Sequence, residues 1–220
     1  MDINKYIDHT VLKAQTTSKD IEKLCTEAIE NKFFSVCVNG CYVEKCAKLL
    51  KNTEVKVAAV VGFPLGAMTK EAKVFEAKEA IKNGASEIDM VINVGKLLEG
   101  DFDYIEAEIR AIKEAIGENI LKVIIETCYL TDEQKIKACE LSLKANADFV
   151  KTSTGFGSGG ATYEDVVLMK KVVRDSAKVK ASGGVRDRET AEKYISLGAE
   201  RLGTSSGIAI LRGEKAKGSY

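Results

Sequence analysis

Residues 149–184 read FVKTSTGFGSGGATYEDVVLMKKVVRDSAKVKASGG and contain one complete strand–helix–strand unit. The first apolar segment ends in Lys151 and passes into a glycine-rich loop. A helical segment follows, in which Val166, Met169 and Val173 recur at the spacing of one apolar helix face. A second apolar segment then runs to Lys180 and ends in two glycines. This pattern predicts two neighbouring strands of a parallel sheet that are joined by a helix.

The same alternation continues in both directions along the chain. Short apolar or β-branched segments, each of a length suited to a strand, occur at residues 6–10, 34–38, 55–61, 87–93, 121–126, 149–152, 179–182 and 201–203. Segments with helical spacing lie between them. Two such spacings are Val74, Ala77 and Ile81, and the stripe of Ile105, Ile109, Ile112 and Ile116. The sequence therefore predicts about eight strand–helix repeats.

Several helix ends are marked by capping residues. Thr131 and Gln134 form a capping-box pattern, and Thr162 with Asp165 resembles one. Glycines follow other helical segments, as they do at helix C-termini, namely Gly84, Gly117 and Gly198.

Two architectures fit this alternation, a closed (β/α)8 barrel and an open doubly wound sheet. Polar residues lie within or at the ends of the predicted strands, among them Asp89, Glu126, Lys151 and Lys180. An open sheet that is buried on both faces has little room for them. A barrel whose C-terminal mouth is a functional site accommodates them directly. We therefore predict an α/β fold with a single TIM barrel over residues 1–220, whose polar tail, residues 213–220, is mobile.

Composition excludes several classes of function. The 220 residues carry 33 Lys+Arg and 33 Asp+Glu, so the formal net charge is zero, which argues against nucleic-acid and polybasic membrane partners. The single histidine, His9, excludes metal sites built on two or three imidazoles, and we expect no metal and no cofactor. None of the six cysteines forms a C-x-x-C pair, which is typical of unpaired thiols in a reducing compartment.

Targeting signals are not apparent in the sequence. The first ten residues contain no apolar segment of the kind that signal peptides have. The longest apolar stretch, residues 57–69, is interrupted by glycine and proline and is shorter than the roughly 20 residues that span a bilayer. We expect a cytoplasmic protein with no membrane partner.

The loop at residues 155–160 matches the pattern G-x-G-x-x-G, which occurs in dinucleotide-binding sites. Such a site belongs to the first strand–helix unit of its domain and needs an acidic residue at the end of the next strand. Here the unit is about the fifth along the chain, and the next strand ends at Ser182, Gly183 and Gly184. A glycine-rich loop that lets the backbone approach another ligand is the better interpretation.

Lys151 and Lys180 are unusual because they end consecutive apolar strands, whereas we expect most of the chain's lysines on helix surfaces. A second cation and partial desolvation both lower the pKa of a lysine, so the pair can supply a neutral amine. That amine can attack a carbonyl and form a Schiff base, and Asp89, inside an apolar strand, is a candidate to shuttle protons. A structural role is the alternative for each residue. The two lysines could bury their methylene groups while their ammonium groups reach solvent, and Asp89 could serve only as the ion-pair partner of a buried lysine.

Two glycine-rich strand ends are candidates for a phosphate site. Gly183 and Gly184 follow the strand of Lys180, and residues 203–207 follow the next strand and open a short helix. Barrels commonly hold phosphate with the loops after their last two strands and the N-terminus of a short extra helix. An ordinary turn and helix cap is the alternative.

Five segments together resemble the deoxyribose-phosphate aldolase family, over nearly the whole chain. They are Asp8-His-Thr-Val-Leu12, Glu87-Ile-Asp-Met-Val-Ile92, Lys122-Val-Ile-Ile-Glu-Thr127, Val150-Lys-Thr-Ser-Thr-Gly155 and Lys180-Ala-Ser-Gly-Gly-Val-Arg186. The resemblance implies a TIM-barrel class I aldolase, a lyase that reversibly cleaves 2-deoxy-D-ribose 5-phosphate to D-glyceraldehyde 3-phosphate and acetaldehyde. Of the two common routes for aldol cleavage, an iminium or a zinc-bound enolate, the single histidine leaves the lysine route.

The resemblance also implies roles for individual residues. Lys151 would form the Schiff base, while Asp89 and Lys180 would donate and accept protons, and Lys180 would lower the pKa of Lys151. The residues that would lie along the phosphate and sugar are Gly155, Gly183, Gly184, Ser205 and Ser206. Those that would line the mouth near the carbonyl are Asp8, Thr10 and Cys37.

The chain departs from the family pattern at one position, and the role of its last residue stays open. Some members carry a lysine after K-T-S-T-G that helps to hold the phosphate, and Phe156 stands there in this chain. Some members end in a tyrosine that reaches the active site, and Tyr220 either has that role or is a chance terminal residue. We expect a homodimer that binds a small phosphosugar. A phosphosugar isomerase or synthase without a Schiff base, and a non-catalytic phosphosugar sensor, are the alternative functions.

Overall fold

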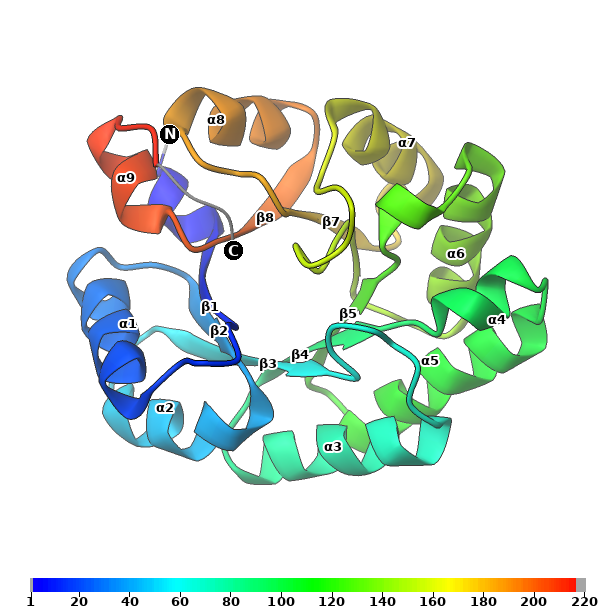
Figure 1. The fold of residues 1–220 in the computed structure, drawn as a ribbon, viewed down its shortest axis with the longest axis horizontal. Coiled ribbons are helices and arrows are strands. Elements are labelled where there is room, and N and C mark those ends of the chain that lie inside the picture. Colours follow the sequence, from blue (N-terminus) through cyan, green and yellow to red (C-terminus); the bar gives the residue numbers. More distant parts are fainter. Residues whose placement is uncertain (1, 217–220) are drawn as a thin grey trace.

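Eight parallel strands close into a barrel in the computed structural model, which describes residues 2–216 (Figure 1). The strands are β1 (Ile7–Val11), β2 (Ser35–Val38), β3 (Lys56–Val61), β4 (Glu87–Val91), β5 (Ile120–Ile124), β6 (Phe149–Lys151), β7 (Lys178–Ser182) and β8 (Ala199–Thr204). Each strand pairs with its neighbours in chain order, and β8 pairs with β1. The predicted barrel is therefore confirmed, and the open sheet is excluded by the pairing of the first and last strands.

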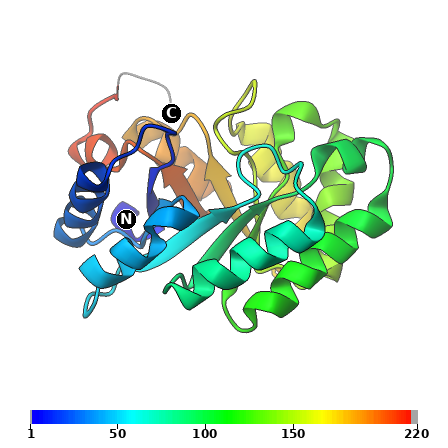
Figure 2. The ribbon, with the colours of Figure 1, turned by 60° about the horizontal axis from the view of Figure 1, so that its bottom comes forward.

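Helices surround the barrel on all sides (Figures 1 and 2). The α-helices are α1 (Ser18–Glu30), α2 (Val43–Leu49), α3 (Lys70–Lys82), α4 (Val94–Leu98), α5 (Phe102–Ile116), α6 (Asp132–Lys144), α7 (Tyr163–Val173), α8 (Arg188–Ser196) and α9 (Gly207–Arg212). Short 3-10 helices are η1 (Ile3–Tyr6), η2 (Gly40–Tyr42) and η3 (Thr127–Tyr129). Over the described part of the chain, no helix is long and apolar enough to cross a membrane.

The local signals in the sequence account for several helix ends. Thr131 and Gln134 form a complete capping box at the start of α6. Thr162 caps α7 by accepting a hydrogen bond from the Asp165 N–H at 3.1 Å. Gly117 ends α5 with a φ of 61°, a left-handed conformation that glycine adopts without strain.

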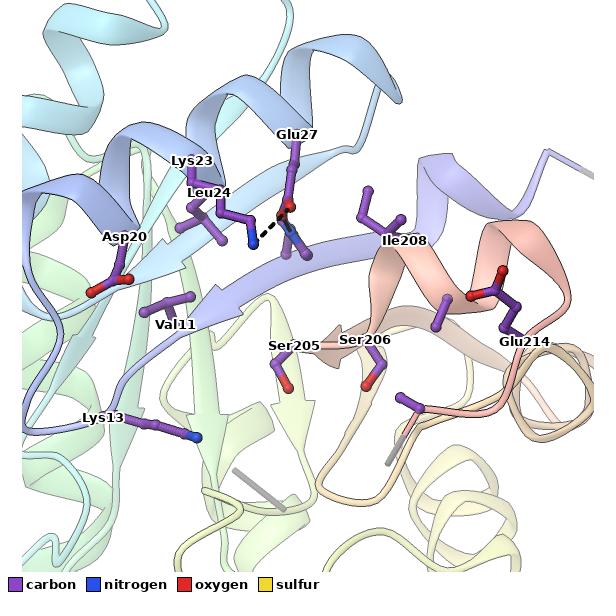
Figure 3. A pocket seen from close by; sticks show the side chains of 13 residues that line it. Val11, Lys13, Asp20, Lys23, Leu24, Glu27, Ser205, Ser206, Ile208 and Glu214 are labelled. Carbon is purple, nitrogen blue, oxygen red and sulfur yellow. Dashed lines mark hydrogen bonds and ion pairs between the residues drawn. The ribbon is translucent and has the colours of Figure 1, made fainter. Parts of the chain in front are cut away.

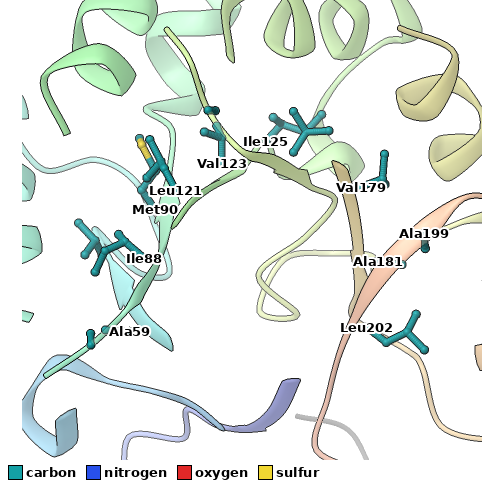
Figure 4. Packing of buried hydrophobic residues seen from close by; sticks show 14 of the residues in the cluster. Ala59, Ile88, Met90, Leu121, Val123, Ile125, Val179, Ala181, Ala199 and Leu202 are labelled. Carbon is teal, nitrogen blue, oxygen red and sulfur yellow. The ribbon is translucent and has the colours of Figure 1, made fainter. Parts of the chain in front are cut away.

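The wall of the barrel is apolar on its outer side. Ile88 and Met90 of β4, and Leu121 and Val123 of β5, are fully buried between the strands and the helices (Figure 4). Successive side chains of a strand point to opposite faces, so the residues that alternate with these point into the barrel. In β4 and β5 those inward positions include Glu87, Asp89 and Lys122.

The interior of the barrel has an apolar part and a charged part. Leu12, Cys37, Ala58 and Val60 form a small buried cluster at β1, β2 and β3. The buried charged side chains of the interior come mainly from β1, β4, β5, β6, β7 and β8, namely Asp8, Glu87, Asp89, Lys122, Lys151, Lys180 and Arg201. Lys122 of β5 and Lys73 of α3 are further lysines that do not lie on a helix surface, because both are fully buried.

Candidate active site

Lys151, Lys180 and Asp89 meet in the interior of the barrel. Lys151 and Lys180 are paired residues on the adjacent strands β6 and β7. Each donates a hydrogen bond to Oδ2 of Asp89, and both distances are 2.7 Å. Asp89 lies across the barrel in β4, so only the closed sheet brings the three together. All three side chains are almost completely buried, with Lys151 3% exposed.

Lys122 is a further member of this cluster that the sequence reasoning did not include. It lies in β5 directly beside Asp89 and donates to Oδ1 of that carboxylate at 2.7 Å. The available signal was the alternation of β5, where Lys122 lies between the outward-facing Leu121 and Val123. That spacing places Lys122 inside the barrel, in the middle of the strand.

Three more charged residues lie next to this cluster. Glu87 forms an ion pair with Lys122 at 2.6 Å and accepts a hydrogen bond from Arg201 at 2.5 Å. Arg201 also pairs with Asp8, which in turn pairs with Lys180. Ser35 donates to Asp8 at 2.7 Å, so the Asp8 carboxylate is held from three sides. The sequence reasoning assigned no role to Glu87 or Arg201.

Lys151 is the lysine of the cluster whose pKa is lowered. Burial disfavours its charged form, and Lys180 lowers its pKa further, while Asp89 acts in the opposite direction. Burial also disfavours the charged forms of Lys122 and Lys180, but their pKa values are raised because two carboxylates face each of them. Lys151 is therefore the lysine that most readily becomes a neutral amine.

The carboxylates of the cluster stay ionised. Burial alone would raise the pKa of Asp89, but Lys122, Lys151 and Lys180 outweigh it and hold that pKa well below the ordinary value of 3.8. The pKa of Asp8 is lowered against burial by Lys180, Arg201 and Lys122. Two ionised carboxylates therefore accompany the lysines at neutral pH.

The three residues expected near the carbonyl lie on β1 and β2. Asp8 is fully buried and engaged by the charged cluster. The Thr10 hydroxyl donates to the backbone carbonyl of Asp8 at 2.8 Å. Cys37, the strand partner of Thr10, places its Sγ 4.0 Å from Oδ2 of Asp89, and burial raises the pKa of its thiol. The Cys37 side chain therefore contacts the cluster as a neutral thiol.

The glycine loops after β6 and β7 pack directly against each other. Gly155, Gly183 and Gly184 all have positive φ, at 86°, 83° and 87°. A Cβ on Gly160 would lie 2.3 Å from the carbonyl oxygen of Gly183, so the two backbones touch. Ala161 N–H donates to the carbonyls of Ser182 and Gly183 at 3.0 Å. A side chain would not fit where Gly160 packs against Gly183, so glycine is required there. These contacts hold the two loops together.

Ser205 and Ser206 follow β8 and line a pocket of about 500 Å³ (Figure 3). Lys13, Lys23 and Glu27 are among its other lining residues, and Lys13 extends toward the two serines (Figure 3). The end of β8 is tied to the loop after β7, since the Thr204 hydroxyl donates to the Val185 carbonyl at 2.7 Å. This hydrogen bond links the loops after β7 and β8. Tyr220 lies outside the described residues.

All six cysteines lie within the described residues and are free thiols. Within the same residues, no group of three or more His, Cys, Asp or Glu side chains is arranged to hold a metal ion.

A closed parallel barrel with a buried lysine of lowered pKa, a second lysine and an ionised carboxylate at its centre defines a class of site suited to amine chemistry on carbonyl compounds. The chain belongs to the DeoC/LacD family of aldolases, whose family model matches residues 3–214. Aldolases are lyases, so the chain is a member of a lyase family. The resemblance drawn from the five sequence segments is confirmed at the level of the family.

Curated relatives and solved structures agree with this assignment. The chain is 61% identical to the deoxyribose-phosphate aldolase of Finegoldia magna, over 97% of this chain and 100% of that protein. It is 56% identical to the deoxyribose-phosphate aldolase of Streptococcus uberis over the full length of both. The solved deoxyribose phosphate aldolase of Aeropyrum pernix, described as a unique tetrameric structure, superposes with a TM-score of 0.88 at 31% identity, covering 96% of this chain and 89% of that one.

Proposed function

We propose that this chain is a class I aldolase that reversibly cleaves 2-deoxy-D-ribose 5-phosphate to D-glyceraldehyde 3-phosphate and acetaldehyde through a Schiff base on Lys151. The observation that carries the proposal is the buried lysine pair, in which Lys151 has a lowered pKa and shares Asp89 with Lys180. The names of the curated relatives support the choice of substrate.

The reaction begins with attack of the neutral Lys151 amine on the aldehyde carbon of the sugar. The carbinolamine loses water and leaves an iminium, which withdraws electrons from the adjacent carbon. The hydroxyl at the third carbon loses its proton, the bond between the second and third carbons breaks, and D-glyceraldehyde 3-phosphate leaves. The electron pair of the broken bond forms an enamine on Lys151. Protonation of that enamine and hydrolysis of the resulting iminium release acetaldehyde.

Lys180 and Asp89 are the proposed proton carriers in these steps. Their contact of 2.7 Å lets a proton pass between the ammonium and the carboxylate, and the same Asp89 oxygen accepts a hydrogen bond from the Lys151 amine. Lys180 also keeps a positive charge beside Lys151, which favours the neutral form of the attacking amine.

The proposed phosphate site consists of backbone N–H groups at Gly155, Gly183 and Gly184 and the hydroxyls of Ser205 and Ser206. The packing of the loops after β6 and β7, and the link between the loops after β7 and β8, support a joint site. A chain of zero net charge needs such local donors to hold a dianionic group.

The proposal is tested by incubating the protein with acetaldehyde and sodium borohydride and locating the adduct by peptide mass spectrometry. We expect an ethyl group on Lys151, no adduct in Lys151→Ala, and a normal adduct in the control Lys171→Ala, whose lysine is exposed on α7. Aldol cleavage of 2-deoxy-D-ribose 5-phosphate should be lost in Lys151→Ala only. Full cleavage by Lys151→Ala, or cleavage by the wild type without trapping, contradicts the Schiff-base route.

We also infer that the chain works as a homodimer. Support comes from large apolar side chains on the surface, including Leu65 at 78% and Phe75 at 68% exposure. Light scattering of the purified protein should give twice the chain mass, and a monomer or a tetramer contradicts the inference.

A further inference from the structure

Glu87 and Arg201 form a buried ion pair inside the barrel that the proposed reaction does not use. They are 3% and 4% exposed, and their side chains meet at 2.5 Å. The Arg201 guanidinium lies 3.4 Å from the centre of the Phe34 ring. A guanidinium keeps its proton throughout the usual pH range, so Arg201 is a permanent positive charge at this place.

The ion pair belongs to a closed ring of alternating charges. Starting from Asp8, the contacts run through Arg201, Glu87, Lys122, Asp89 and Lys180 and return to Asp8. Each group of the ring contacts a group of opposite charge on either side of it, and Lys122 also lies 4.0 Å from Asp8 across the ring. Three negative and three positive groups make up the ring, so its net charge is zero when all six are ionised.

Lys151 is attached to this ring but is not part of it. It contacts Asp89 at 2.7 Å, and among the described residues Asp89 is the single carboxylate within ion-pair distance of its amine. The other groups that act on Lys151 are Lys180 on β7 and Cys37 on β2, with Glu126 after β5. A protonated Lys151 gives the buried cluster one uncompensated positive charge, and a neutral Lys151 removes it.

We propose that Glu87 and Arg201 are positioning residues that close the charge ring and act in opposite directions on the proton of Lys151, Arg201 favouring the neutral amine and Glu87 the ammonium. This inference rests on the proposed function of Lys151 as the Schiff-base lysine. Without Arg201, three carboxylates face three lysines, and Lys151 keeps its proton as the third partner. Without the Glu87 charge, the cluster has a larger positive excess, and Lys151 loses its proton more readily.

The two changes therefore shift the pH dependence of trapping in opposite directions. Glu87 lies two residues from Asp89 on the same strand face, about 7 Å along the strand, and thus roughly 10 Å from the Lys151 amine. A unit charge at that distance, with an effective dielectric near 20, shifts a pKa by about one unit. The acidic limb is the pH range in which the rate of borohydride trapping with acetaldehyde falls because Lys151 becomes protonated. We expect this limb to move down by about one pH unit in Glu87→Gln and up by about one pH unit in Arg201→Met.

The experiment measures the trapping rate against pH in the wild type, both single variants and the double variant Glu87→Gln/Arg201→Met. The double variant again has one more cation than carboxylates, so its acidic limb should return close to that of the wild type. The control is Glu79→Gln, which removes a carboxylate from an exposed ion pair with Lys82 outside the barrel interior and should leave the limb in place. Damage to the fold alone lowers the amount trapped and does not move the limb in opposite directions.

Further outcomes separate this inference from the proposed function. If a single variant does not fold, Arg201→Lys and Glu87→Asp keep the charges, and the ring predicts an unshifted limb for both. A wild type that forms no adduct on Lys151 contradicts the proposed function itself. A wild type that is trapped normally, with limbs that stay fixed or move the same way in Glu87→Gln and Arg201→Met, overturns the ring and leaves the Schiff base intact.

Discussion

Glu126 holds the loop that follows Lys151. Its Oε1 accepts from the Thr154 N–H at 3.1 Å, and its other oxygen accepts from the Thr154 hydroxyl. That hydroxyl accepts in turn from the Phe156 N–H at 3.0 Å. Glu126 has a φ of 54°, a left-handed conformation that is uncommon for a residue with a side chain. One carboxylate thus connects the end of β5 to the loop that contains Gly155.

Replacing Thr154 by valine should loosen this loop and weaken phosphosugar binding. The change removes the hydroxyl between Glu126 and Phe156, and a hydrogen bond to a charged group contributes about 1.5–3 kcal/mol. We expect KM for 2-deoxy-D-ribose 5-phosphate to rise about tenfold or more, while trapping by acetaldehyde, which has no phosphate, stays near the wild-type rate. Steady-state kinetics measures both, and Thr154→Ser is the control that keeps the hydroxyl. An unchanged KM in Thr154→Val contradicts the loop's role in binding.

At the scale of single residues, the sequence identified the ends of strands better than their interiors. Lys151 ends β6 as predicted, whereas Lys180 lies two residues before the end of β7. Both stand directly before small residues, so their position alone marks them. Lys122 and Arg201 lie within their strands, with side chains that point into the barrel. Alternate residues of a strand point to opposite faces, so an error of one residue in the predicted alternation would place both side chains outside the barrel. Glu87 starts its strand and resembles an exposed terminal residue until the barrel is closed around it.

A second buried ion pair joins helices α3 and α5 to the end of β4. Lys73 of α3 contacts Glu108 of α5 at 2.6 Å and donates to the carbonyl of Val91 at 2.8 Å. Glu108 also accepts from the N–H of Asn93 at 3.1 Å. Burial lowers the pKa of Lys73 and raises that of Glu108, because the low-dielectric surroundings disfavour both charges. The pair therefore sets how two helices lie against the strand that carries Asp89.

Removing one partner of this pair should destabilise the protein strongly. In Lys73→Met the Glu108 carboxylate stays buried without its cation, and we expect the free energy of unfolding to fall by about 3–5 kcal/mol. The double variant Lys73→Met/Glu108→Leu should recover most of that loss, since no unpaired charge is left. Urea unfolding measures both. Lys82→Met, from an exposed pair with Glu79, should change the stability by less than about 1 kcal/mol. A double variant as unstable as the single one contradicts the account.

The elements themselves were largely predictable, whereas the buried face of α3 was not. Each of the eight predicted strand segments overlaps a strand of the barrel. The stripe of Val74, Ala77 and Ile81 predicted the helix, but its buried residues are Lys73, Ala77 and Ala80. Hydrophobicity alone assigns a lysine to the surface, and only the presence of Glu108 on the neighbouring helix makes burial of Lys73 possible.

At the scale of the whole molecule, closure of the barrel and assembly of the site are one event. Local periodicity is the same in an open parallel sheet and in a barrel, so the polar residues within the strands were the basis for choosing between them. The structure shows why these polar residues favour the closed barrel. Asp8 on β1 contacts Lys180 on β7 and Arg201 on β8, so the first and last strands share buried charges that an open sheet would leave unpaired.

This shared network predicts how stability depends on pH. Asp8 and Asp89 have folded-state pKa values below the ordinary 3.8, so the stability they contribute is complete above about pH 4 and is lost as the pH falls through the folded values. Glu108 and Glu126 have raised pKa values, so their contribution has the opposite sign and grows as the pH falls toward 4.5. The free energy of unfolding should therefore be greatest under mildly acidic conditions and fall steeply below pH 4.

Urea titrations at a series of pH values between about 7 and 2 measure this curve, with each unit of pKa difference worth about 1.4 kcal/mol. Asp8→Asn removes one depressed carboxylate, and the acidic slope should become shallower even if the variant is less stable at pH 7. Asp132→Asn, at an exposed position on α6, should keep the wild-type slope. If the free energy of unfolding falls with pH as steeply in Asp8→Asn as in the wild type, acid unfolds the protein through groups other than the charges that join β1 to β7 and β8. Closure of the barrel would then not depend on the groups that form its site.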